Sequence, residues 1–395
     1  MSGEMLGATS GDVQVSIGGL PPLADLEPQW LALEDRADTS YFNCWSWMGH
    51  WLGRLPSHIK PQLVRAYAGD KTLALCILVQ GRSIRYRIVP VRLASLNSTG
   101  IESLDALMIE NNDVLFDRSC GHDIRGRVIR EILRTQSIEE LRIDGVRMNA
   151  KWPEIGVPGY DIFVLERIAR GIDLSEVRAG GGEFLPLISA NSRSKIRKAL
   201  KDTAKMGELR LELPQDVNQA EALFDALCRL HSAAWSERGE PGAFANQFLL
   251  EFHRNLIRGR YDSGEIQIVA VRAGEALIGV LYNFLHRGRV YSYQSGFDYT
   301  LGPTQYKPGL LAHTMAIEHN ARLGHDYYDL MAGDSQYKRS LGRRAETLQW
   351  VVFQNDSLKF RVVNGLRALK QHFQERRNLE PQPAPAEDQR GQELA

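Results

Sequence analysis

The chain has 395 residues, of which 43% are hydrophobic, and its 48 Lys and Arg side chains balance its 48 Asp and Glu side chains. At roughly 100–200 residues per domain, this length predicts two domains, each large enough to bury a core without disulfide or metal crosslinks. The zero formal net charge disfavours a protein that binds DNA through its overall charge, because such proteins carry a basic excess.

The features that report on the compartment predict a cytoplasmic protein. The four cysteines form no C-x-x-C pair and lie far apart, at Cys44, Cys76, Cys120 and Cys228, which is typical of a reducing compartment. Residues 1–18 lack the basic and apolar regions of a signal peptide. No segment reaches the ~18 uninterrupted apolar residues that a helix needs to cross a bilayer, so we expect no transmembrane segment.

In chain order, the composition divides the protein into five parts. Residues 1–20 have little apolar periodicity and are predicted to be disordered, as is the Pro-rich charged tail at 375–395. Three consecutive glycines within residues 179–183 predict a linker. We therefore expect an N-terminal half at 21–178 and a C-terminal half at 184–374.

The two halves share one order of predicted elements. In the first half, β-rich runs at 63–67, 73–79 and 84–91 are separated by glycine turns, and a helix at about 124–133 and a strand at 141–143 follow. The second half repeats this order with strands at 266–271, 277–285 and 290–293, a helix that starts within residues 306–309 with Pro308 in its first turn, and a strand at 327–331. Helices at 191–206 and 216–235 precede this repeat, and a strand at 348–353 follows it. The pattern predicts an α+β fold of two tandem halves, each a mixed, mostly antiparallel sheet flanked by helices.

Several common chemistries lack their motifs. The sequence contains no G-x-G-x-x-G after a strand, no G-x-x-x-x-G-K-[ST], no G-x-S-x-G and no H-E-x-x-H. His313, His319 and His325 recur every six residues, which does not place them on one helix face. We therefore expect no metal site.

Two features of the second half carry chemistry. The helix opened by Lys307 and Pro308 would present the free N–H groups of Gly309, Leu310 and Leu311, and with the charge of Lys307 these suit a phosphate or pyrophosphate. An ordinary capped helix is the alternative. The second feature is a loop at a strand end that combines an acid, a phenol and cations, at Asp334, Tyr337, Lys338, Arg339 and Arg343. A solvated charged loop is the alternative there.

Together these motifs resemble a known family. The matching stretches are the basic helix at 191–200, Leu230-His231-x-x-x-Trp235-x-x-Arg238-Gly239, Gly296-x-Asp298, Pro308-Gly309-Leu310-Leu311 and Asp329-x-x-x-Gly333-Asp334-x-x-Tyr337-Lys338. They resemble the GNAT-type acyltransferase domain of proteins associated with bacterial cellulose and exopolysaccharide synthesis. That domain is related to the Fem-type peptidyltransferases, which consist of two GNAT-like halves. The resemblance covers residues 185–355; over residues 40–170 it rests on the repeat and on aromatic residues at 41–47.

The resemblance implies transfer of an acyl group from a thioester to an amine. In this family two adjacent parallel strands separate in the shape of a V, and the acyl-CoA binds between them. Here acetyl-CoA or another acyl-CoA would lie in the V between strands 291–297 and 327–331, with Lys307, Pro308, Gly309, Leu310 and Leu311 as the cofactor-binding residues. It also implies a substrate-binding role for His231, Trp235, Arg238 and Asp298, although a packed core pair is the alternative for the first two. Fem-type relatives use an aminoacyl-tRNA donor, so tRNA stays open as an alternative partner.

The chemistry assigns roles within the loop. An alkyl amine with a pKa near ~10 must lose a proton before it attacks, and Asp334 is the candidate base. Tyr337 is the candidate acid or oxyanion donor, and Lys338 would stabilise anionic charge. By analogy, the acceptor would be a small-molecule amine or amino sugar of exopolysaccharide or envelope metabolism. A catalytically silent protein that binds a partner in a polysaccharide-synthesis system is the non-enzymatic alternative.

Overall fold

A computed structural model describes residues 13–85, 89–121, 123–147, 152–301, 307–362 and 364–365. The first half contains β1 (Gln14–Gly19), α1 (Leu23–Glu34), α2 (Trp45–Arg54), β2 (Pro61–Ala68), β3 (Lys71–Arg85), β4 (Val89–Leu96), β5 (Leu115–Phe116), α3 (Asp123–Thr135), β6 (Glu140–Arg147) and α4 (Trp152–Ile155). β7 (Tyr160–Asp173) and α5 (Leu174–Ala179) follow. The second half contains α6 (Ala190–Thr203), β8 (Leu209–Glu212), α7 (Val217–Ser236), α8 (Gln247–Arg260), β9 (Ile266–Ala273), β10 (Ala276–His286), β11 (Arg289–Phe297), α9 (Pro308–Arg322), β12 (Tyr327–Ala332) and α10 (Gln336–Leu341), and β13 (Arg344–Asn355) comes last.

The predicted α+β repeat is confirmed. In the first half, β2, β3 and β4 form an antiparallel meander, and β4 pairs in parallel with β6 after α3. In the second half, β9, β10 and β11 form the same meander, and β11 pairs in parallel with β12 after α9. The other neighbouring strands of the described residues pair antiparallel, so each half is a mixed, mostly antiparallel sheet.

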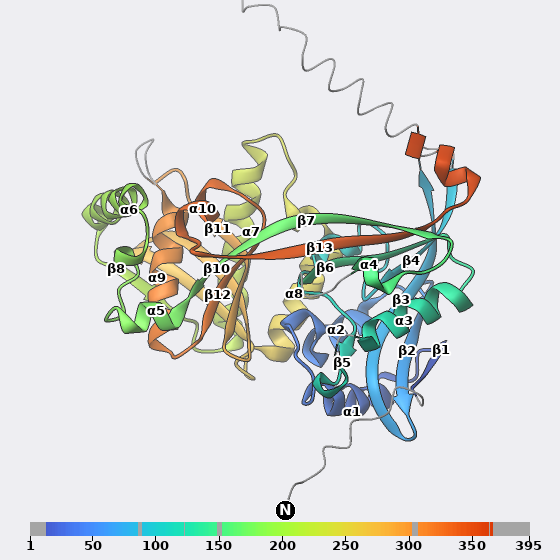
Figure 1. Cartoon of the computed structure of the whole chain (residues 1–395). Coiled ribbons are helices and arrows are strands. Elements are labelled where there is room, and N and C mark those ends of the chain that lie inside the picture. Colours follow the sequence, from blue (N-terminus) through green and yellow to red (C-terminus); the bar gives the residue numbers. More distant parts are fainter. Residues whose placement is uncertain are drawn as a thin grey trace, which may run out of the picture.

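Two long strands join the halves into one sheet. β7 pairs with β13 from Gly171↔Arg344 to Tyr160↔Asn355. β13 also pairs with β6 of the first half, and β7 pairs with β12 of the second half. Figure 1 shows β7 and β13 side by side, crossing from one half of the molecule to the other. The glycine-rich segment 179–183 is the turn after α5, in which Gly181 and Gly182 have positive φ.

The predicted disorder at residues 1–20 is wrong for its second part. Residues 1–12 lie outside the described residues, but Gln14–Gly19 form β1, which pairs with β2. The reason is an alternation of Val13, Val15 and Ile17, which pack against the core that includes α3. The predicted disordered tail at 375–395 lies outside the described residues.

The aromatic helix α2 lies in a core that both halves build. The Trp47 ring packs 4.8 Å from the Phe252 ring of α8, and the Tyr41 ring stacks on Phe284 of β10 at 4.4 Å. Trp47 and Tyr41 are completely buried. Since this core fixes the two halves relative to each other, loops of the first half can take part in a site of the second.

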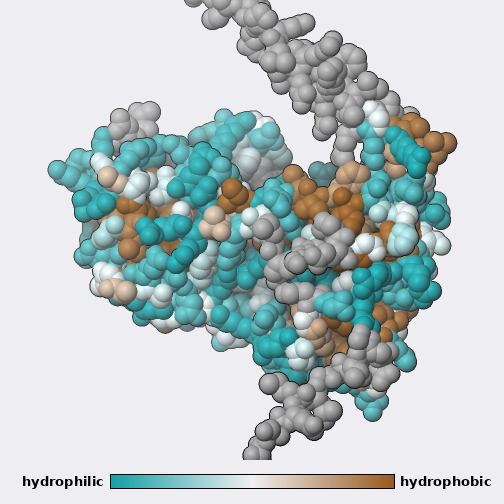
Figure 2. Space-filling model, viewed as in Figure 1, coloured by the Kyte–Doolittle hydropathy of each residue, from teal (hydrophilic) through white to brown (hydrophobic). Residues whose placement is uncertain are grey.

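The middle of the molecule also exposes apolar side chains. On β7, Phe163, Leu165 and Ile168 keep 40%, 55% and 42% of their surface exposed. Figure 2 shows apolar surface in the middle of the molecule, where β7 and β13 run side by side from one half to the other. Among the described residues, the helices are too short or too polar to cross a membrane.

Candidate active site

The two parallel strands of the second half separate as predicted. β11 and β12 pair only where Arg289–Tyr291 face Tyr327–Asp329, although β11 continues to Phe297 and β12 to Ala332. A bulge at Tyr293 interrupts the pairing of β11 with β10, and Met331 of β12 has a positive φ of 64°. The strands therefore open into a V at the positions that the sequence indicated.

A buried ion cluster holds the closed end of this V. Arg289 Nη2 lies 2.7 Å from Asp329 Oδ2 and 2.7 Å from Glu346 Oε2, and its guanidinium lies 4.2 Å from the centre of the Tyr327 ring. Burial alone would lower the pKa of Arg289, but the two carboxylates raise it, so the guanidinium stays charged. Asp329 Oδ1 accepts a hydrogen bond from the Met331 N–H at 2.8 Å, which stabilises the unusual backbone at Met331.

A cavity of about 510 Å³ opens beside β11. Eight predicted site residues line it, namely His231, Trp235, Arg238, Lys307, Pro308, Gly309, Leu310 and Tyr337. Seven further lining residues were not named individually as site residues in the prediction, although the predicted strand 291–297 includes four of them: Ala234, Gln294, Ser295, Gly296, Phe297, Tyr299 and Ser335. The cavity thus brings together α7, the free end of β11, the start of α9 and the start of α10. We call it the donor cavity, after the acyl donor that the family resemblance implies.

The start of α9 retains anion-binding capacity. The Gly309 and Leu310 N–H groups have no hydrogen-bond partner in the described part of the chain, and the first turn contains no acidic residue. The prediction of a free N–H at Leu311 is wrong, because this N–H donates to the Lys307 carbonyl at 3.3 Å. The Leu311 side chain is also buried outside the cavity. A Cβ at Gly309 would lie 3.2 Å from Cε2 of Phe297. The predicted loop residues Gln305 and Tyr306 lie outside the described residues.

α7 supplies a packed wall and an exposed rim. The Ala243 N–H donates to His231 Nε2 at 3.4 Å, so Nδ1 carries the proton, which it donates to the Ser295 carbonyl at 3.2 Å. Burial lowers the pKa of His231, which therefore packs as a neutral ring. Trp235 is 37% exposed at the rim, with the Arg238 guanidinium 5.5 Å from its ring centre.

Besides Leu311, three predicted residues lie outside the donor cavity. Asp298 closes a turn by accepting hydrogen bonds from the N–H and hydroxyl of Thr300 at 2.8 and 2.6 Å. Asp334 is ion-paired with Arg339 at 2.9 Å and Arg170 at 3.2 Å, and these arginines lower its pKa. An exposed carboxylate with a lowered pKa is a poor proton acceptor, so the geometry disfavours Asp334 as the base.

The third of these residues, Lys338, contacts the last residues of β12 from outside the donor cavity. Its Nζ donates to the carbonyls of Met331 at 3.2 Å and Ala332 at 2.6 Å. Burial lowers the pKa of Lys338, while Glu110 and Asp329 oppose this effect. Lys338 therefore supports the backbone of the V from outside the cavity.

Tyr337 stacks on a histidine and keeps its hydroxyl proton. Its ring stacks on His313 at 5.3 Å with an angle of 9° between the planes. Burial raises the pKa of Tyr337, so its hydroxyl stays protonated over the physiological range. Burial also lowers the pKa of His313 to about 3, so the imidazole that stacks on the phenol is neutral.

The first half contributes a residue that the sequence analysis missed. Glu110 Oε2 accepts a hydrogen bond from the Ala332 N–H at 2.7 Å, at the open end of β12. Burial raises the pKa of Glu110 to about 7, and Asp329, Lys338 and Arg167 are the charged groups that face it. The only local signal is an acid between the apolar run 107–109 and two asparagines; nothing in it points to a strand 222 residues away.

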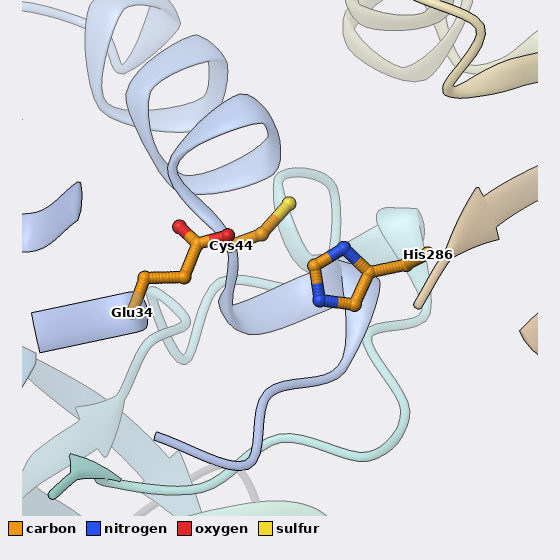
Figure 3. Close-up of side chains that lie close together, drawn as sticks. All are labelled: Glu34, Cys44 and His286. Carbon is orange, nitrogen blue, oxygen red and sulfur yellow. The ribbon is translucent and has the colours of Figure 1, made fainter. Parts of the chain in front are cut away.

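A separate cluster of potential metal donors is already occupied by internal hydrogen bonds. Side chains of Glu34, Cys44 and His286 approach one another within 4.8 Å (Figure 3). Glu34 accepts from the Trp45 N–H at 2.8 Å, Cys44 Sγ donates to the Tyr41 carbonyl at 2.9 Å, and His286 Nε2 lies 2.6 Å from the Thr39 hydroxyl. Burial raises the pKa of the Cys44 thiol, which opposes the thiolate that a metal needs.

Comparisons with known proteins agree with the geometry. Residues 190–339 match the family described as "Acetyltransferase (GNAT) domain". The fold is similar to that of FemX, with a TM-score of 0.54 and 9% identity over 85% of this chain and 96% of that one. It is also similar to a C-terminal domain from Agrobacterium fabrum assigned to a lysylphosphatidylglycerol synthetase, with a TM-score of 0.51 and 12% identity over 88% of this chain and 98% of that one. No functionally curated protein matches the sequence.

Proposed function

We propose that the protein is an N-acyltransferase that uses an acyl-CoA donor bound in the donor cavity. The observation that carries this proposal is the combination of an open strand pair with a helix start free to bind an anion, inside the residues that match a GNAT domain. Lys307 and the free N–H groups of Gly309 and Leu310 suit the pyrophosphate of coenzyme A. Trp235 and Arg238 at the rim suit a nucleotide base and phosphate.

The chain's own groups fit the requirements of the transfer. The amine nitrogen bonds to the acyl carbon while the carbon–sulfur bond breaks, so the departing thiolate requires a proton. Tyr337 lines the cavity and its hydroxyl stays protonated, so we assign it as the proton donor in this proposal. Beyond Tyr291, no described strand pairs with this edge of β11, which suits the extended arm of coenzyme A.

The acceptor belongs to the same proposal. We expect a small amine or an amino sugar, connected by family analogy with exopolysaccharide or envelope metabolism. A Fem-type reaction with an aminoacyl-tRNA donor is the second candidate, and the similarity to the FemX fold supports it. It predicts weak coenzyme A binding and tRNA binding that falls steeply with salt.

The test is product detection with a panel of amines and acetyl-CoA. We expect equal amounts of free thiol and acetylated amine by mass spectrometry. Tyr337→Phe should lower kcat by about 10²–10³-fold, because it removes the proton donor. Tyr67→Phe removes a similar hydroxyl, bonded to Gln14 on the surface of the first half, and should leave kcat unchanged. The absence of thiol release with every amine and acyl-CoA would contradict the proposal.

A further inference from the structure

A second cavity lies where the first half meets the long strands. Its volume is about 210 Å³, and its wall includes three carboxylates, two indoles and a guanidinium, from Asp105, Glu110, Asp144, Trp51, Trp350 and Arg167. The segment 98–112 and β6 form one side, while β7 and β13 form the other. We call it the acceptor cavity.

Two of the three carboxylates have unused hydrogen-bonding capacity. Asp105 is committed, because it accepts from the Thr99 N–H at 2.8 Å and the Gly100 N–H at 2.7 Å. Asp144 makes no hydrogen bond or salt bridge with any described residue. Among the described residues, Glu110 accepts a hydrogen bond only through Oε2, which leaves Oε1 available. Burial raises the pKa of both Glu110 and Asp144, which indicates that each lacks a cationic partner strong enough to offset its loss of water.

Glu110 connects the acceptor cavity to the V. It lines the acceptor cavity, and its other oxygen is bonded to Ala332 at the open end of β12. Tyr337, which lines the donor cavity, is close enough for the Glu110 charge to raise its pKa further. The carboxylate therefore lines the acceptor cavity and at the same time contacts the open end of β12.

The same segment of chain closes the corresponding opening in the first half. There, β4 and β6 pair only from Leu93–Ser95 to Glu140–Arg142. Beyond this pairing a Cβ at Gly145 would lie 3.1 Å from Cα of Glu110, so the segment packs directly on β6. The first half thus fills its own V with the segment that delivers Glu110 to the second V.

We propose that the acceptor cavity binds a small primary amine with a second cationic group, and that Glu110 is the catalytic base of the transfer. This inference rests on the proposed acyltransferase function. Asp144 would hold the second cation, and the Trp51 and Trp350 rings would line the apolar part of the substrate. Arg167 lies over Trp350 at 4.7 Å and stays at the exposed mouth.

The step conserves atoms and charge. Glu110 takes one proton from the ammonium, and the released lone pair forms the carbon–nitrogen bond as the carbon–sulfur bond breaks. The thiolate takes the Tyr337 hydroxyl proton, and the second proton lost by nitrogen restores that hydroxyl. Glu110 then returns its proton to water, so one proton is released for each amide formed.

The test measures amine binding independently of turnover, with 1,4-diaminobutane as the probe in calorimetry. Glu110→Gln keeps an oxygen for the Ala332 N–H but removes the charge, and Asp144→Asn does the same at the second position. Both should weaken diamine binding at least tenfold, which is about 1.4 kcal/mol. Glu102→Gln, an exposed residue of the same segment, is the control and should bind normally. Acetyl-CoA should bind all three variants as it binds the wild type.

Turnover adds a second readout. In the wild type, kcat/KM should rise with pH to an inflection near the Glu110 pKa of about 7, because the base must be ionised. In Glu110→Gln this inflection should disappear. Equal diamine binding by the wild type and both cavity variants, or no diamine binding by the wild type, would overturn the acceptor assignment even if acetyl-CoA binds. Failure of acetyl-CoA to bind would instead contradict the proposed function.

Discussion

The ion cluster at the closed end of the V gives a quantitative prediction for Asp329→Asn. Asparagine keeps the oxygen that accepts from the Met331 N–H but loses the charge that faces Arg289. The Asp329 side chain is 1% exposed and the Arg289 side chain 13%. Removing one partner of such a buried pair costs about 3–5 kcal/mol. Because Glu346 still neutralises Arg289, we expect the lower end, about 3 kcal/mol.

Urea denaturation measures this loss as a lower midpoint at an unchanged slope. Asp334→Asn is the matched control, because Asp334 is likewise an aspartate paired with arginine, here Arg170 and Arg339, but is solvent-exposed. This variant should leave the midpoint almost unchanged. A change of less than about 1 kcal/mol for Asp329→Asn would refute the view that this cluster holds the strands together. So would an equal change for the two variants.

Three further predictions concern packing, charge and pH. Gly296→Ala should destabilise the protein by about 1–3 kcal/mol in urea denaturation, since its Cβ would lie 2.5 Å from the Leu227 carbonyl, whereas Gly81→Ala meets open space and should be nearly neutral. Lys307→Ala should weaken acetyl-CoA binding in calorimetry at low salt, and the difference should shrink as salt is added; a salt-independent difference would contradict a charge effect. Glu110 has a higher pKa folded, about 7, than unfolded, 4.5, so wild-type stability should fall as pH rises between these values. Glu110→Gln should therefore gain about 1–3 kcal/mol over the wild type at about pH 8 and nothing at about pH 4, and a gain at both would refute the shift.

The elements of the two repeats could be predicted from the sequence because each has its own signal. Glycine turns separate the strands of both meanders, and Pro308 marks the first residue of α9. The family resemblance, rather than these signals, indicated the position of the V and named eight residues that line one cavity. The resemblance to a known family supplied their grouping into one site.

Features that depend on long-range pairing could not be predicted. β7 pairs with β12 and β13, although most of the second half of the chain separates β7 from these strands in the sequence. No local pattern specifies such distant partners. Glu110 reaches Ala332 only because the aromatic core fixes one half against the other. Asp334 has the residue type expected of a base, but its two arginines become apparent only in the folded protein.

The most direct test of the central claim, that the start of α9 binds the acyl donor, is calorimetric titration of acetyl-CoA into the wild type, Gly309→Ala and Gly309→Glu. Gly309→Ala adds only a Cβ at 3.2 Å from the Phe297 ring edge, so it should bind nearly as the wild type does. Gly309→Glu places a negative charge where the pyrophosphate is expected, and binding should be lost. Equal binding by Gly309→Glu and the wild type, or no binding and no thermal stabilisation of the wild type, would contradict the account.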